Sequence, residues 1–160
     1  MTAAIEALKG ARLPMLRRLW LMDIEKLSKA HRLFGTIGEI SHVFQIAPAM
    51  DKLRLHGNFT PAEPTHYKRL AVIEVEVDDT GATGGPLDQR TVFNLMLPDL
   101  PGLAHCDLDL SDDPPEFHYH IPDAFLPPQH FPLLQSLAIN SLTAKSAIQL
   151  EDWQAKQGVG

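Results

Sequence analysis

The sequence has little of several features that would assign a class of protein at once. It has one cysteine in 160 residues, which excludes an internal disulfide framework and a cysteine-rich zinc module. No apolar run approaches the roughly 20 residues that cross a bilayer, and the N-terminus lacks the basic start, apolar middle and cleavage site of a signal peptide. These absences predict a cytoplasmic protein without a membrane span.

Basic residues are scarce beyond the first 34 positions. Residues 1–34 hold seven Lys or Arg against three acidic residues, whereas residues 35–160 hold seven against seventeen. An acidic body repels nucleic acid phosphates, and the basic residues near the N-terminus are interleaved with apolar ones rather than clustered with aromatics. We therefore expect no nucleic acid partner.

The length of the chain suits one domain. A single α+β domain over residues 1–160 is large enough to bury roughly two thirds of its unfolded surface. We find no internal repeat and no domain linker in the sequence.

The first predicted element is an amphipathic helix over Pro14–Phe34. Its apolar residues recur at helical spacing, Pro14 suits a first helical turn, and Gly35 would end the helix. The opposite side would be a solvated basic face, or a docking surface for an acidic partner or an anionic membrane. The basic residues of this surface are Arg17, Arg18, Lys29 and Arg32.

Strand-like stretches follow this helix. Lys52–Phe59 and Arg69–Asp78 alternate apolar and polar residues, which is typical of a sheet with one buried face. Short connections without a helix of ten or more residues favour antiparallel neighbours. The sequence therefore predicts an antiparallel meander of about six strands, over Glu39–Ile46, Lys52–Phe59, Arg69–Asp78, Arg90–Leu97, Ala104–Leu110 and Glu116–Ile121.

The end of the chain predicts a second helix. No charged residue occurs between Ala124 and Ala144, and the length of this segment favours an apolar helix over Phe131–Thr143. Residues 144–153 are compatible with a continuation of that helix or with a last strand. The two terminal helices would pack on one face of the sheet and give a two-layer α+β domain.

Potential metal ligands are concentrated between His105 and His120. In a hairpin with a four-residue loop, the polar rows of the last two predicted strands would share one face, because side chains alternate along a strand. Imidazole and carboxylate groups placed in this way can hold a divalent transition metal. One alternative is therefore a small metal-dependent enzyme with His105, Asp107, His118 and His120 as ligands; the other is a solvated polar face without a metal.

Cys106 lies within the same segment. An N-terminal helix, a strand meander and then a cysteine resemble ubiquitin-conjugating folds in element order, and this resemblance would imply a thiol enzyme. The His-Pro-Asn motif that precedes the cysteine in that family is absent here. A buried, inert thiol is the interpretation that the residue type itself favours.

The lack of a clear catalytic set favours a non-enzymatic binding or accessory module. Such a module would hold a protein partner, a second copy of the chain or an apolar ligand between its helices and a curved sheet, without a cofactor. The aromatic residues predicted to line that cavity are Trp20, Phe34, Phe44, Phe59 and Phe93.

Overall fold

The fold is taken from a computed structural model of the chain. It describes residues 8, 10–22, 24–27, 32–34, 36–60, 67–77, 88–96, 100–110, 118–121 and 131–159. The described strands are β1 (Arg18–Met22), β2 (Ile24–Leu27), β3 (Arg32–Phe34), β4 (Thr36–Glu39), β5 (Lys52–His56), β6 (Asn58–Thr60), β7 (Val72–Glu76), β8 (His105–Asp109) and β9 (Ser136–Ile139). The described helices are α2 (Ser41–Ile46), α3 (Gln89–Met96) and α4 (Ala144–Gln157).

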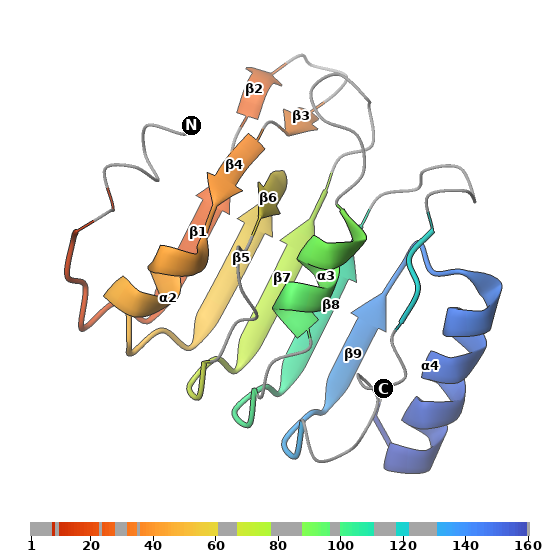
Figure 1. Ribbon diagram of the computed structural model, residues 1–160. Coiled ribbons are helices and arrows are strands. Elements are labelled where there is room, and N and C mark those ends of the chain that lie inside the picture. The colour runs from red at the N-terminus through yellow and green to blue at the C-terminus, as the bar shows by residue number, and fades with distance from the viewer. Residues whose placement is uncertain are drawn as a thin grey trace.

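A sheet of five parallel strands forms the centre of the fold (Figure 1). Its order is β1-β5-β7-β8-β9, so these five strands are neighbours in the same order in which they occur along the chain. Every neighbouring pair is parallel and in continuous register. Two smaller sheets accompany it, an antiparallel pair of β2 with β3 and a parallel pair of β4 with β6.

A nine-residue segment repeats once for each strand of this sheet. Its first, fourth, seventh and ninth residues are apolar, or cysteine in one instance, and its last four residues lie in the strand. In four of the five segments the fourth residue donates its N–H to the carbonyl of the first, which closes a tight turn ahead of the strand. The segments are LPMLRRLWL from residue 13, APAMDKLRL from 47, YKRLAVIEV from 67, LPGLAHCDL from 100 and FPLLQSLAI from 131.

Successive segments are joined by the same pair of hydrogen bonds. The carbonyl of Arg17, the fifth residue of the first segment, accepts the N–H groups of Asp51 and Lys52 at 2.8 and 3.1 Å. The carbonyls of Asp51, Ala71 and Ala104 accept the equivalent two N–H groups of the segment that follows each of them. The chain is therefore a short solenoid, in which each coil contacts its neighbours through one strand and one turn.

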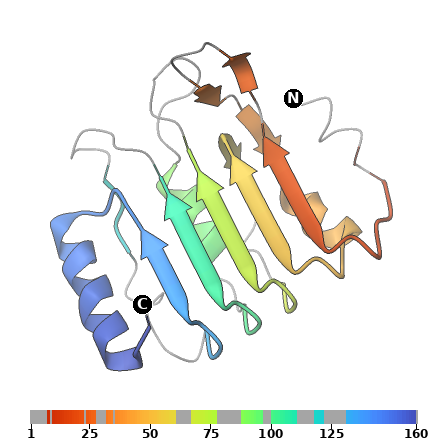
Figure 2. The same cartoon turned by 180° about the vertical axis from the view of Figure 1, so that it is seen from behind.

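The two faces of the sheet differ in their cover. Helices α2 and α3 lie on one face of the sheet (Figure 1). The seventh and ninth residues of the segments belong to this face, because Ile73, Cys106 and Leu137 line a cavity with Leu95 of α3, and most of these residues are buried in one contiguous cluster. From behind, Figure 2 shows the strands without a described helix in front of them. The side chains on that second face are mostly polar, as alternation along a strand requires.

Helix α4 lies beside β9 at the end of the sheet (Figures 1 and 2). Thr143 caps its start, since its hydroxyl accepts the N–H of Ser146, and Gly158 ends it in the left-handed conformation at φ 68°. Gln154 of this helix donates its side-chain N–H to the carbonyl of Leu137 at 2.6 Å. The helix thereby occupies a backbone acceptor of β9, the last strand of the sheet.

The predicted antiparallel meander is wrong, because the five main strands are parallel. The prediction rested on the shortness of the connections. A parallel connection requires only about a dozen residues, with or without a long helix, and each coil of a solenoid supplies that length through turns and short elements.

Both predicted terminal helices are also wrong where they were placed. Strands β1, β2 and β3 lie within Pro14–Phe34, and β9 lies within Phe131–Thr143, whereas the C-terminal helix begins at Ala144. The fourth and seventh residues of the repeated segment are three positions apart, so pairs such as Leu16 with Leu19 and Leu134 with Leu137 imitate helical spacing.

Two predicted strands are helices. Glu39–Ile46 contains α2, and Arg90–Leu97 overlaps α3. In α3 the buried residues follow the spacing of one helical face. They are Thr91, Val92, Asn94 and Leu95. Of the predicted strand Glu116–Ile121, the described part makes one isolated parallel bridge, from Tyr119 to Leu142, and does not pair with β8.

The parallel register can be tested by disulfide trapping. Arg18 and Lys52 are partners in adjacent strands, which lie about 4.8 Å apart, a separation within the usual range of disulfide-bonded Cα atoms. The double variant Arg18→Cys with Lys52→Cys should form a disulfide on mild oxidation, detected by peptide mass analysis. The control Arg18→Cys with His56→Cys separates the thiols by about 13 Å along β5 and should not; bonding in the control alone would indicate antiparallel pairing.

Gly102 provides a test of the contact between turns. A Cβ atom at this position would lie 2.7 Å from the carbonyl oxygen of Lys68 and 3.3 Å from that of Leu70. Because both atoms belong to the backbone of the preceding turn, Gly102→Ala should lower the free energy of unfolding by about 1–3 kcal/mol in chemical denaturation. Met15 occupies the same position of the first turn with 83% of its surface exposed, so Met15→Ala should change stability by less than about 0.5 kcal/mol. Equal effects would contradict the close approach.

Candidate functional site

The candidate site is the second face of the five-stranded sheet (Figure 2). The register aligns the side chains of this face, most of them polar, in rows that cross the strands. One row, in strand order, consists of Trp20, Arg54, Glu74, Asp107 and Ala138. The next consists of Met22, His56, Glu76 and Asp109. A parallel register therefore brings together residues that are distant in the sequence.

An aromatic and basic zone covers β1 and β5. Trp20 is 57% exposed although it is among the largest apolar side chains. The guanidinium of Arg54 lies 5.3 Å from the centroid of the Trp20 ring, within the range of a cation–π interaction. The ring of His56 lies 5.5 Å from the same ring. These contacts hold the indole in place on a face that no described helix covers.

Glu74 neutralises two cations of the adjacent strand. Its carboxylate accepts hydrogen bonds from Lys52 and Arg54 and forms an ion pair with each. Burial raises the pKa of Glu74, but the hydrogen bonds from Lys52 and Arg54 outweigh that effect and keep the pKa below its usual value. Glu76 lies 3.1 Å from Nδ1 of His56.

The next strand carries two aspartates without a cationic partner. Within the described part of the chain, Asp107 makes no hydrogen bond or ion pair. Asp109 accepts a hydrogen bond from the side-chain amide of Asn140, whose carbonyl in turn accepts the N–H of Leu110 at 2.6 Å. The amide of Asn140 holds the carboxylate of Asp109 in position. Because the amide is uncharged, it does not neutralise the carboxylate.

Two hollows meet at these aspartates. One, of about 310 Å³, is lined by Arg54, His56, Glu74, Glu76 and the two aspartates, with Val75 between them. The other, of about 580 Å³, lies among β8, β9 and α4 and is also lined by Asp107 and Asp109. The carboxylates therefore stand at the rim between two open depressions of the surface.

The predicted metal ligands are only partly brought together. His105 and Asp107 are exposed on the same face of β8, as expected. His118 and His120 flank the bridge of Tyr119 to Leu142, and the neighbours of β8 are β7 and β9, so the expected hairpin is not formed. The backbone of His120 is instead paired with the side-chain amide of Gln89.

No group of three or more His, Cys, Asp or Glu side chains within the described ranges is arranged to hold a metal ion. A metal site that involves His105 and Asp107 stays a prediction of the sequence.

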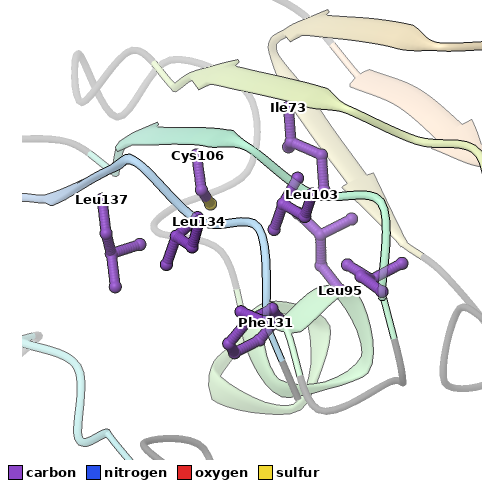
Figure 3. Close-up of a pocket in the computed structure, with 8 residues that line it drawn as sticks. Ile73, Leu95, Leu103, Cys106, Phe131, Leu134 and Leu137 are labelled. Atoms are coloured by element: carbon purple, nitrogen blue, oxygen red, sulfur yellow. The ribbon is translucent and has the colours of Figure 1, made fainter. Parts of the chain in front are cut away.

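Cys106 lies on the covered face, in a small apolar cavity beneath α3 (Figure 3). The thiol is 2% exposed, and burial together with the nearby charge of Asp107 raises its pKa to about 12. A thiol that stays protonated near neutral pH is a poor nucleophile, which argues against a thiol enzyme. The cavity encloses about 10 Å³, roughly the space of one water molecule, so it has no room for an apolar ligand.

The predicted aromatic cavity is divided between different parts of the structure. Trp20 lies on the uncovered face, Phe59 is buried in the core, and the ring of Phe44 packs 5.5 Å from that of Tyr67. The side chains of Phe34 and Phe93 lie outside the described residues.

The predicted basic surface is not a helix face. Arg18 is exposed at the start of β1, and Arg17 pairs with Asp51 at 3.3 Å on the surface. Arg32 lies in β3, but its side chain is outside the described residues. Lys29 is entirely outside them.

Comparisons with protein families, with curated proteins and with solved structures found no match to this chain. Among the described helices, none has the length and apolar composition that crossing a membrane requires. The class of the protein is thus given by its architecture alone, a solenoid of short coils with one helix-covered and one uncovered sheet face.

The role of Glu74 leads to a pH prediction. A carboxyl group with a lowered pKa in the folded state stabilises the fold above its unfolded pKa, and that contribution is lost as the pH falls through the folded value. Glu74→Gln should therefore lower the unfolding free energy at pH 7, and the gap from the unmodified protein should shrink below about pH 4.5. Urea denaturation across this range measures the gap; a gap of constant size would show that ionisation of Glu74 is not its origin.

Proposed function

We propose that the protein is a non-enzymatic binding module that docks a protein partner on the uncovered face of its parallel sheet. The observation that carries this proposal is the exposure of Trp20 on that face, in line with charged side chains of three further strands. Tryptophan is enriched among the residues that dominate the affinity of protein interfaces, and an exposed one surrounded by polar groups is typical of such a site.

The architecture supports the same proposal. Stacked coils create an extended surface, and solenoids use such surfaces for binding. The L-x-x-L-x-L spacing ahead of and within each strand is also that of leucine-rich repeats, one class of solenoid. This likeness concerns the architecture and supports a binding role by analogy only.

A peptide selection against the folded protein tests the proposal. Displayed random peptides selected on the unmodified protein should lose at least tenfold in affinity for the variant Trp20→Ala with Arg54→Ala, measured by fluorescence anisotropy. The control variant Ile148→Ala with Lys156→Ala changes exposed residues of α4 and should bind as the unmodified protein does. Thermal denaturation should show that both variants are folded.

The same selection can contradict the proposal. If the selected peptides bind the Trp20 and Arg54 variant and the control equally well, the uncovered face is not the docking surface.

A further inference from the structure

The charges on the uncovered face are not evenly balanced. On β5 and β7, the cations Lys52 and Arg54 are paired with Glu74, and His56 is close to Glu76. On β8, Asp107 and Asp109 form no ion pair with a cation of the described chain, although Arg54 and His56 line one of the two hollows that they share. The face therefore changes from an aromatic and internally neutralised zone at β1 and β5 to a negative zone at β8.

The hollow beside β8 continues the negative zone onto the last helix. Its carboxylates are Asp107, Asp109 and Glu151, and no Lys, Arg or His is among the described residues that line it. Apolar groups of Ala138 on β9 and of Ala147 and Leu150 on α4 form part of its wall. A depression with an apolar wall and several carboxylates is complementary to a long basic side chain, which buries its aliphatic stem and keeps its cation near the anions.

Asn140 fixes the position of one carboxylate in the wall of this hollow. Two of its side-chain hydrogen bonds join Asp109 to the backbone of Leu110, so one of the carboxylates is held on a rigid element before any partner arrives. A preorganised carboxylate loses little conformational entropy on binding, which favours affinity.

We propose that the partner docks an extended basic segment across this face, with an Arg or Lys side chain in the hollow between β8, β9 and α4 and an apolar residue against Trp20. This inference rests on the proposed function and adds the chemistry of the partner. Strands β8 and β1 are separated by three strand spacings, or about 14 Å, which an extended chain covers in about four residues. The basic and the apolar residue of the segment therefore lie about four positions apart.

Two synthetic probes test the charge requirement. The first is the peptide Gly-Arg-Ser-Gly-Ser-Leu-Gly, acetylated and amidated at its ends, and the second carries Glu in place of Arg. Titrated into the isotope-labelled full chain, the Arg peptide should shift the amide resonances of Asp107, Asp109, Ala138 and Glu151. The Glu peptide should leave them unchanged. The effect of the Arg peptide should weaken as salt is raised, because exposed charges are screened.

Matched variants locate the site. Asp107→Asn with Asp109→Asn removes both charges and keeps an oxygen that can accept the hydrogen bond of Asn140, so the fold should be retained and the affinity for the Arg peptide should fall at least tenfold. Asp88→Asn with Asp152→Asn removes two exposed charges elsewhere and should leave the affinity unchanged. An equal loss in both variants would overturn the proposal, because a general electrostatic attraction would then explain it.

The sequences from the peptide selection separate this inference from the function on which it rests. Selected peptides that require Trp20 and Arg54 and carry a basic residue about four positions from an apolar one support both. Selected peptides that require the face but lack basic residues overturn the inference and leave the proposed function intact. Peptides that bind independently of the face overturn both.

Discussion

The structure depends on one hydrogen-bonding arrangement that is repeated four times. A carbonyl oxygen just ahead of a strand accepts two consecutive N–H groups of the next segment, at Arg17, Asp51, Ala71 and Ala104. These two backbone hydrogen bonds align each strand with its neighbour without any contribution from side chains, and they set the register of the sheet. Buried residues such as Leu53 and Leu55 can then stack on the equivalent residues of the next coil, and burial of these stacked side chains is the main stabilising contribution.

The same register builds the candidate site. Trp20, Arg54, Glu74 and Asp107 occupy one row because each is the eighth residue of its segment. No contact between distant loops is needed to assemble such a row, and its side chains are carried by strands rather than by loops. A face of this kind is well suited to contact with an extended partner, because its rows are rigid and repeat at the spacing of the strands. The exposed side chains of each row can differ in charge and polarity without loss of the fold, because the fold depends on the apolar positions of the segment.

The segment richest in potential ligands shows how alternation divides chemistry between the two faces. In β8, His105, Asp107 and Asp109 point to the uncovered face, while Cys106 and Leu108 point into the core. This one strand geometry has two consequences. Cys106 is buried, which raises its pKa to about 12, and Asp107 is exposed and open to a partner. At the end of the sheet, α4 completes the arrangement, since Gln154 occupies a backbone acceptor of β9 and Glu151 adds a carboxylate to the adjacent hollow.

The sequence by itself determined the strands whose polar and apolar residues alternate strictly. Lys52–His56, Val72–Glu76 and His105–Asp109 all lie within predicted strands, and the polar side chains of β8 are exposed as expected. Alternation is a local property, so it can be read from a single segment.

The two terminal segments were wrongly predicted as helices because the apolar residues of a turn and of the strand after it are three positions apart, which is also a helical spacing. Which strands are neighbours, and that they are parallel, was decided only by tertiary structure, because hydrogen bonds between coils join residues that no local pattern connects. For the same reason the sequence predicted that Asp107 shares one face of a hairpin with His118 and His120, whereas the folded chain places it between Glu74 and Ala138.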